Sequence, residues 1–382
     1  MAATTEPVSQ NAAKALVGVV RAQEDLVASV DRVLRLCGSG DCVHEGDRVL
    51  IKPNLHGGNG HTSPLLMEAA CKWAFASGAS HVTLGDGPYW GHQDVDGYFE
   101  YAGVFAACKA SGAVPANFHA DEYRIHHPNS PHTPDTLGVS RYLYEHDVVI
   151  NLPVMKTHFN TLITIALKNV KGCLRPVDKR NLHECDLNRG LAVVNQIIAP
   201  RITVTLCDVL GAFEGLGPGS ATPVGMGLLL ASADPVALDV VACQLMKIAP
   251  ESVRLIQECA AAGVGVADPE RIEVMGERVA DHARRFLLPH EALAANFPGL
   301  TIHSAKACSC CMQNLFQALE QVQKSGREPA FRRLLIGPGP TTEADLLIGR
   351  CAAEGRDCRP DVPGCPPPIE HILAALCPEE AD

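Results

Sequence analysis

A short apolar run, Val148–Ile150, limits the folds open to this chain because it leads directly into residues 151–172, where polar side chains are interleaved with core-like ones. Pro153 bounds the run, and a short apolar run of this kind is typical of a buried strand in a parallel sheet. Open α/β sheets bind ligands just beyond the carboxyl ends of their strands. The polar side chains of residues 151–172 are therefore expected at the ligand-binding edge of a sheet.

Similar apolar runs recur along the chain and alternate with helical patterns. Strands are predicted at residues 14–20, 48–51, 82–84, 114–118, 203–206, 226–230 and 272–274. Helices are predicted at residues 25–36, 64–76 (capped by Thr62 or Ser63), 98–110, 191–198, 236–246 and 251–262. This alternation predicts an α/β fold in which a layered, mostly parallel sheet is flanked by helices. Residues 121–140 are predicted to form an excursion or hairpin, and residues 173–190 a loop that could act as a lid.

The loops that follow four of the predicted strands carry polar side chains. They hold Lys52 with Asn54, Asp86, Lys156 with His158, and Asp208 with Glu214, while Lys168 and Asn169 follow the apolar residues 162–167. Loops at one edge of a parallel sheet can converge, so these side chains are expected to form a single site. Lysines, asparagines and a histidine together can bind an anion and move a proton.

Roles within this site follow from the chemistry of the side chains. His158 is the candidate general acid/base because the ordinary pKa of histidine lies near neutrality, and Lys156 and Lys168 complete the catalytic candidates. The substrate-binding candidates are Lys52, Asn54, Asp86, Asn169, Asp208 and Glu214. Two alternatives stay open: a surface loop with solvated lysines, and helix capping or turn formation by the two aspartates.

Length and charge restrict the classes of partner. The chain has 382 residues, enough for one large α/β domain and a smaller second one, with the boundary expected near residue 300 (1–300 and 301–382). A formal net charge of −11 argues against nucleic acid and anionic membranes as main partners. The polar N-terminus lacks the layout of a signal peptide, and no apolar run is long enough to span a bilayer. A cytoplasmic protein, which could form a homo-oligomer, is therefore expected.

The cysteines nearest the end of the chain indicate a metal site. Sixteen cysteines in a chain without an export signal are not expected to form a disulfide framework. Cys308 and Cys311 have Cys-x-x-Cys spacing, and Cys351 and Cys365 lie on separate predicted loops. Four thiolates can hold a zinc ion or a 4Fe–4S cluster, and the Cys365-Pro366 pair favours the cluster. Zinc and free buried thiols remain alternatives, and Cys310 or Cys358 could replace a proposed ligand.

Several separated motifs resemble the domain-of-unknown-function family 362. The matching stretches are residues 51–55, 85–86, 151–158, 167–172, 214–219 and 233–239, so the resemblance covers roughly residues 15–280. Many members look like iron–sulfur proteins with repeated Cys-x-x-Cys motifs, which implies a cluster here. This chain departs from that pattern, since its tail has one Cys-x-x-Cys and two isolated cysteines. The resemblance implies a fold and offers no settled reaction.

These observations predict an iron–sulfur enzyme of anaerobic or microaerobic metabolism that acts on a small anionic substrate at the edge of the sheet. The cluster would pass single electrons, as in a reductase, or act as a Lewis acid, as in a lyase of the dehydratase type. An electron-donor protein is a possible partner. The alternative is an electron-transfer or metallocofactor-handling protein that has no substrate of its own.

Overall fold

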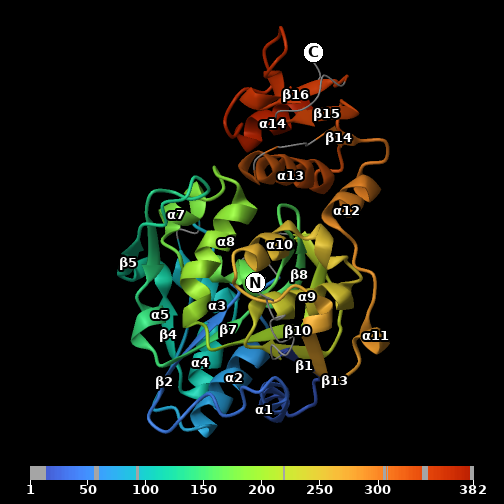
Figure 1. Ribbon diagram of the computed structural model, residues 1–382. Coiled ribbons are helices and arrows are strands. Elements are labelled where there is room, and N and C mark those ends of the chain that lie inside the picture. The colour runs from blue at the N-terminus through green and yellow to red at the C-terminus, as the bar shows by residue number, and fades with distance from the viewer. Residues whose placement is uncertain are drawn as a thin grey trace, which may run out of the picture.

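The computed structural model describes residues 14–55, 60–91, 94–217, 220–303, 307, 309–337 and 343–378. In this part of the chain, eleven strands form one large sheet whose main path runs β13-β1-β12-β10-β7-β2-β3-β4. All neighbours on that path are parallel except β12, which is antiparallel to both β1 and β10. The predicted α/β fold with a mostly parallel sheet is confirmed (Figure 1).

The bounds of the elements follow the predicted order. The strands of the large sheet are β1 Ala15–Arg21, β2 Arg48–Pro53, β3 His81–Asp86, β4 Val114–Asn117, β7 Val148–Leu152, β8 Val154–His158, β9 Leu162–Thr164, β10 Val204–Leu216, β11 Ser220–Pro223, β12 Leu228–Ser232 and β13 Ile272–Gly276. The helices up to residue 296 are α1 Leu26–Leu36, α2 Pro64–Ala76, α3 Val95–Tyr101, α4 Val104–Ser111, α5 Tyr142–Glu145, α6 Ala166–Asn169, α7 Pro176–Asn181, α8 Leu187–Ile198, α9 Pro235–Met246, α10 Arg254–Ala261, α11 Val279–His282 and α12 Pro289–Asn296. Short 3-10 turns lie at Phe118–Ala120, Val170–Cys173, Ala199–Arg201, Pro250–Ser252, Pro269–Arg271 and Arg350–Ala353.

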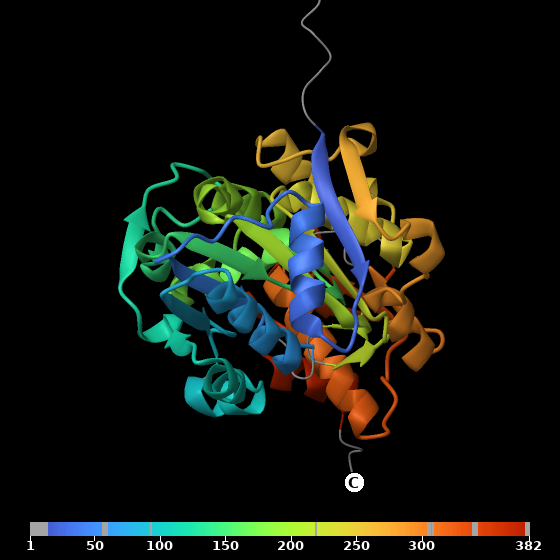
Figure 2. The same ribbon diagram turned by 90° about the horizontal axis from the view of Figure 1, so that it is seen from below.

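Helices cover both faces of the large sheet. Successive side chains of a strand point to opposite faces, so each strand contributes to two hydrophobic cores. In β2, for example, Leu50 packs into the core with α6, α8, α9 and α10, whereas Val49 and Ile51 pack into the core with α1, α2, α3 and α4. Figure 2 shows α1 and α2 side by side on the second of these faces. Strands buried on both faces explain why the sequence shows short continuous apolar runs rather than alternation.

Three local predictions are wrong. The helix predicted at residues 98–110 is two helices, α3 and α4, because the chain turns at Gly103 with a φ of +73°, which is unfavourable for a residue with a side chain. Residues 173–190, predicted to be a loop, contain α7 and the start of α8. The strand predicted to end at residue 206 continues to Leu216 as β10, since β11 and β12 both pair with it.

Residues 121–140 form the predicted hairpin. Strands β5 (Tyr123–His126) and β6 (Leu137–Ser140) pair antiparallel in a separate two-stranded sheet. The β8–β9 pair is a feature that the sequence did not predict. β8 follows β7 directly after Pro153. Whereas β7 pairs with β2, β8 pairs with β10 at Asp208 and Phe213.

A second, three-stranded parallel sheet begins at Thr301, and the described residues from there on are called the C-terminal unit. It contains β14 Thr301–His303, α13 Ser309–Lys324, β15 Arg333–Ile336, β16 Leu346–Ile348 and α14 Ile369–Leu376. Its apolar side chains form their own core, which also takes in Leu293 and Phe297 from the preceding segment. Helix α13 lies on the side of this unit that faces the large sheet (Figure 1).

The start of α9 offers a test of the fold. Asp234 caps this helix: Oδ1 accepts from the N–H groups of Val236 and Ala237, each at 2.9 Å, and Oδ2 accepts from Val266 N–H at 2.9 Å. We expect Asp234→Ala to lower the free energy of unfolding by about 1–2 kcal/mol, as loss of a helix cap does. Asp234→Asn, which keeps one acceptor, should cost less. Equal urea-unfolding midpoints for the two variants would contradict this role.

Candidate functional site

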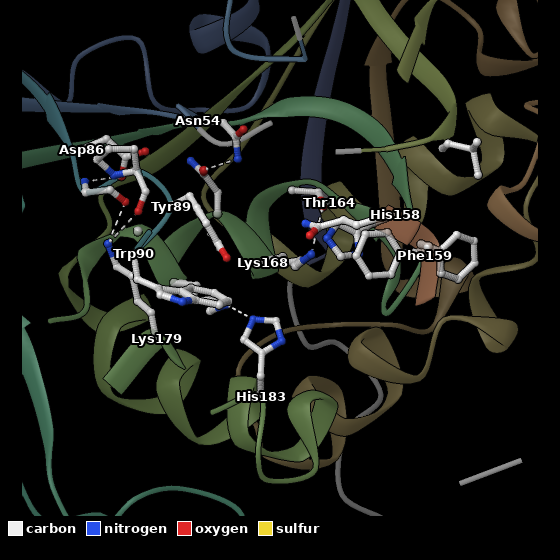
Figure 3. Close-up of a pocket in the computed structure, with 18 of the residues that line it drawn as sticks. Asn54, Asp86, Tyr89, Trp90, His158, Phe159, Thr164, Lys168, Lys179 and His183 are labelled. Carbon is white, nitrogen blue, oxygen red and sulfur yellow. Dashed lines mark hydrogen bonds between the residues drawn. The ribbon is translucent and has the colours of Figure 1, made fainter. Parts of the chain in front are cut away.

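A cavity of about 220 Å³ lies between the carboxyl ends of β2 and β3, the β8–β9 pair, α6, α7 and helix α13 of the C-terminal unit (Figure 3). Its walls therefore come from segments that are hundreds of residues apart, and the C-terminal unit supplies one of them through Phe316, Gln317 and Glu320. This position, beyond the carboxyl edge of parallel strands, is where open α/β sheets bind ligands.

The floor of the cavity is a buried ion pair between neighbouring strands. Lys52 Nζ at the end of β2 lies 2.8 Å from Asp86 Oδ1 at the end of β3. The same ammonium donates to Pro53 O at 2.9 Å and to Asn169 Oδ1 at 3.1 Å. Asp86 also accepts from the N–H groups of Leu55 at 3.0 Å and Gly87 at 2.8 Å. Both charges are thus fully hydrogen-bonded, as burial of an ion pair requires.

Gly172 makes room for this pair. A Cβ at this position would overlap both the Asp86 carboxylate and the Lys52 ammonium. The glycine that closes the motif at residues 151–172 is therefore needed for the close approach of its backbone to the ion pair.

Asn169 links the floor to the wall. Its Nδ2 donates to Asn151 Oδ1 at 2.8 Å, and its Oδ1 accepts from Asn54 Nδ2 at 2.9 Å. Asn54 Oδ1 in turn accepts from Lys156 Nζ at 2.9 Å. Because Lys156 is held from behind by Asn54 and by Gly60 O at 2.6 Å, its amine supports the floor and does not reach the cavity. Burial lowers the pKa of Lys156 to about 7.

Lys168 differs from the other buried lysines. It is only 7% exposed, it lines the cavity, and Nζ donates to Thr164 Oγ1 at a long 3.4 Å. Among the described residues no carboxylate forms an ion pair with it. Burial, with the nearby charges of Lys171 and Lys156, holds the pKa of Lys168 well below that of an ordinary lysine.

Asp239 holds the backbone that carries Lys168. From the middle of α9 its carboxylate accepts from Ala166 N–H at 2.8 Å and Leu167 N–H at 3.3 Å, the first two residues of α6. Asn195 Nδ2 donates to Leu167 O at 2.8 Å. Burial raises the pKa of Asp239 to about 8. The short helix is thus fixed at both its N–H and C=O groups, so Lys168 is held against the cavity.

His158 lies at the same end of the cavity as Lys168 and Thr164 (Figure 3). The β8–β9 register pairs His158 with Leu162 and Lys156 with Thr164, so His158 and Thr164 are diagonal neighbours on one face. His158 Nδ1 accepts from Asn160 N–H at 3.0 Å, so a neutral ring carries its proton on Nε2. Phe159 stacks on the His158 ring, and Phe316 of α13 stacks on Phe159.

The opposite wall joins an aromatic pair to further basic groups. The rings of Tyr89 and Trp90 are 4.3 Å apart, and the Trp90 ring is 4.9 Å from that of His183. Lys171 Nζ lies 4.8 Å from the centre of the Trp90 ring and contacts His183 Nε2. This geometry allows a cation–π interaction.

Lys179 lies beside the floor. Its Nζ donates to Gly87 O at 2.7 Å and lies 3.1 Å from His119 Nε2. Burial lowers its pKa to about 7.

The structure brings six of the nine predicted residues of the sheet-edge site to the cavity: Lys52, Asn54, Asp86, His158, Lys168 and Asn169. Three lie elsewhere, and their contacts are structural. Lys156 is behind Asn54, as described above. Asp208 accepts from Ser63 N–H at 2.7 Å and from Leu210 N–H at 2.9 Å, and burial raises its pKa to about 6. It thus binds the start of α2, where the Ser63 side chain itself makes no capping bond. Glu214 binds Leu287 N–H at 2.9 Å and pairs with Arg284.

Sequence reasoning missed Trp90, Lys171, Lys179 and His183 as members of the site. Lys171 stands inside the motif at residues 167–172, and Lys179 and His183 stand in the segment read as an unstructured loop. The concentration of basic residues at 171–183 was the signal that could have identified them.

The predicted metal ligands are described only in part. Cys308 and the side chain of Cys310 lie outside the described residues. Cys311 is buried, Cys351 is half-buried, and Cys358 and Cys365 are exposed. The segments that bear Cys311, Cys351 and Cys365 approach one another: a Cβ on Gly349 would lie 3.7 Å from Cys311 Sγ in α13, and Arg350 N–H donates to Gly364 O at 2.9 Å. Within the described ranges, no group of three or more His, Cys, Asp or Glu side chains is arranged to hold a metal ion.

The fold and site define an α/β protein with a lysine-lined cavity at the carboxyl edge of its sheet. The family described as "Domain of unknown function (DUF362)" matches residues 49–244, which hold nearly all of that cavity, and the chain belongs to this family. The predicted resemblance is confirmed.

A thylakoid-associated protein of Synechocystis sp. is 32% identical over 238 residues, which cover 60% of this chain and 72% of that protein. Two solved structures are similar at low identity. A Thermotoga maritima protein has a TM-score of 0.41 and 11% identity, covering 85% of this chain and 73% of its own. The lactate racemase apoprotein of Thermoanaerobacterium thermosaccharolyticum has a TM-score of 0.37 and 10% identity, covering 62% and 58%.

None of the helices in the described ranges combines the length and apolar character that a bilayer crossing requires. A cytoplasmic location stays a prediction.

The burial of Lys168 lowers the free energy of unfolding at neutral pH. In the unfolded chain its amine is protonated at neutral pH, whereas its folded pKa is lowered, so the unfolded state binds the extra proton and stability rises with pH towards the ordinary lysine pKa. We expect Lys168→Met to raise the free energy of unfolding at neutral pH by about 0.5–2 kcal/mol, the gain typical of removing a functionally strained group.

The advantage of Lys168→Met should shrink as the pH is raised towards 10.5, the ordinary pKa of a lysine side chain. Lys109→Met, at an exposed position on α4, is the matched control and should change stability little. Thermal unfolding across a pH series measures both. A variant less stable than the wild type at neutral pH would show that the Lys168 amine stabilises the fold.

Proposed function

We propose that this protein is an enzyme that binds a small anionic organic substrate in the cavity and uses Lys168 and His158 to move a proton. The observation that carries the proposal is the charge of the walls. Among the described lining residues, four lysines (Lys52, Lys168, Lys171 and Lys179) face two carboxylates (Asp86 and Glu320). The whole chain, in contrast, has a formal net charge of −11. An anion bound beside Lys52, Lys171 and Lys179 would favour the protonated forms of these lysines, while Lys168 can stay neutral at the other end of the cavity.

The contacts of the lysines suggest how they would divide this work. Lys52 is paired with Asp86, and Lys179 is bonded to the Gly87 carbonyl, so both act mainly through the positive potential they add. Lys171, beside His183 and Trp90, is placed to meet the anionic group of the substrate. Lys168 and His158 would then face the reacting atoms at the other end.

The two groups have complementary proton chemistry. A lysine with a lowered pKa can accept a proton at neutral pH. The neutral His158 ring, with Nδ1 occupied by Asn160 N–H, can donate from Nε2. One group thus removes a proton while the other polarises an oxygen, which is the division of labour needed next to a carbonyl or carboxyl group.

Trp90 provides a direct assay of anion binding, because the chain has two tryptophans and Trp73 lies far from the cavity against Asp31. In a Trp73→Phe background we expect acetate, pyruvate, benzoate or inorganic phosphate to change the fluorescence of Trp90. Lys171→Met should weaken binding about 10- to 100-fold, the range expected for one charged hydrogen bond. Bound anion should raise the pKa of Lys179, which burial lowers to about 7, and draw in a proton, so affinity should fall as pH rises.

Lys109→Met is again the matched control and should bind like the parent. Ethanolamine, a small cation, should cause no change. If no anion alters the fluorescence, or if Lys171→Met leaves every dissociation constant unchanged, the cavity is not an anion site.

We also propose that the C-terminal cysteines hold a 4Fe–4S cluster that serves redox or dehydratase-type chemistry at the cavity. Support comes from the approach of the segments that bear Cys311, Cys351 and Cys365. The described side chains do not by themselves complete a ligand set, since Cys308 lies outside them. Helix α13 carries both Cys311 and Phe316, which are about 7–8 Å apart along the helix axis. The same helix thus connects the cysteines to the cavity wall.

Metal analysis tests the cluster. Anaerobically purified protein should be brown, with about four irons and four sulfides per chain. Cys311→Ala and Cys351→Ala should lose the iron. Cys377→Ala is the matched control in the same unit, because Cys377 is a buried thiol directed at Glu328 O, and it should keep the iron. A colourless protein with one zinc would overturn the iron assignment, and retention of iron by both ligand variants would overturn the ligand assignment.

A further inference from the structure

The Lys168 amine makes a weaker hydrogen bond than the amines of the lysines around it. Each of its basic neighbours has a short hydrogen bond: Lys52 to Asp86 at 2.8 Å, Lys156 to Gly60 O at 2.6 Å and Lys179 to Gly87 O at 2.7 Å. For Lys168 the hydrogen bond that the described residues provide is the 3.4 Å contact to Thr164. Because no strong acceptor stabilises the protonated amine of Lys168, the neutral amine, which has a free lone pair, is favoured.

The position of this amine is fixed although its bonding is weak. Asp239 and Asn195 hold α6 from two sides, and Asn169, the next residue, is bound to Asn151. The residue is nearly buried and lines the cavity. A reactive group needs such fixed support to be held in a productive geometry.

The surroundings favour the neutral, nucleophilic form. Burial and the positive charges of Lys171 and Lys156 lower the pKa of Lys168. Desolvation and a second cationic group are the two means by which proteins activate lysine as a nucleophile towards carbonyl compounds.

We propose that the Lys168 amine attacks the carbonyl carbon of a small oxo acid bound in the cavity and forms an imine with it. The inference rests on the proposed function, since the acid must first bind as an anion. The carboxylate would lie towards Lys171 and His183, and the carbonyl group towards Lys168 and His158. A cavity of about 220 Å³ between the Trp90 and Phe159 rings accommodates a short or aromatic oxo acid.

The step balances without a further reactant. The nitrogen lone pair forms the C–N bond while the π pair of the carbonyl moves to oxygen, where the His158 Nε2–H hydrogen-bonds to it. Both protons of the amine pass to that oxygen, and the Thr164 hydroxyl is placed to relay them. The C–O bond then breaks, water leaves and the C=N bond remains. Nothing is oxidised or reduced.

Borohydride trapping tests the imine. The full-length protein is incubated with pyruvate or phenylpyruvate and sodium cyanoborohydride, which reduces the imine to a stable secondary amine. Intact mass and peptide mapping should place one adduct on Lys168, formed at least about tenfold faster than on the exposed Lys109, because the neutral form of a lysine with a lowered pKa is abundant. Lactate, which has no carbonyl group, should give none.

Lys168→Arg is the decisive variant, because it keeps a long basic side chain at this position and cannot form an imine with the oxo acid. It should bind pyruvate by Trp90 fluorescence and show no adduct. Thr164→Val should bind pyruvate and form the adduct more slowly.

The outcomes separate the two proposals. If pyruvate binds and no adduct forms on Lys168, or if Lys168→Arg is labelled like the wild type, the imine is overturned and the anion site stands. If neither oxo acid nor any other anion alters Trp90 fluorescence, both proposals fail.

Discussion

The ion pair between Lys52 and Asp86 supports the rest of the site. It joins the ends of two adjacent parallel strands, and its ammonium also binds Asn169 of α6, so three segments meet on one charge. Such a pair contributes little net stability once desolvation is counted, but loss of either partner leaves a buried charge without compensation. The absence of a side chain at Gly172 is part of the same arrangement. The geometry of Asn54, Asn169 and Lys168 depends on this pair remaining intact.

Around that pair, the protein tolerates a concentration of lysines that is unfavourable for folding. Three of them, Lys156, Lys168 and Lys179, have lowered pKa values because burial disfavours their charged forms. Natural cores rarely bury lysine without an acidic partner. Asp86 is the carboxylate that pairs with Lys52, and its charge also acts on Lys156 and Lys179, so one acidic group serves several buried amines. The buried lysines are confined to the carboxyl edge of the sheet, where α/β proteins bind their ligands.

The fold was largely readable from the sequence because short apolar runs, buried on both faces, carry a strong local signal. Lys52, Asp86 and Lys168 were placed in the site because they follow such runs. Asp208 and Lys156 are also polar residues near a strand end, but they do not line the cavity. Asp208 accepts from Ser63 N–H, and Lys156 donates to Asn54 Oδ1. The choice between those partners depends on side-chain contacts across more than a hundred residues. Helix α7, only six residues long, has too short a pattern to be recognised, and with it Lys179 was missed.

Helix α13 supplies Phe316 to the wall of a cavity that is otherwise built from residues 52–216. During synthesis the ribosome therefore makes all strands of the large sheet, with Lys168 and His158, before it makes this wall. The stacked pair of Phe159 and Phe316 forms only after the C-terminal unit has docked. A nascent or truncated chain would expose its basic groups to water, where their pKa values return towards ordinary values and the amine is protonated.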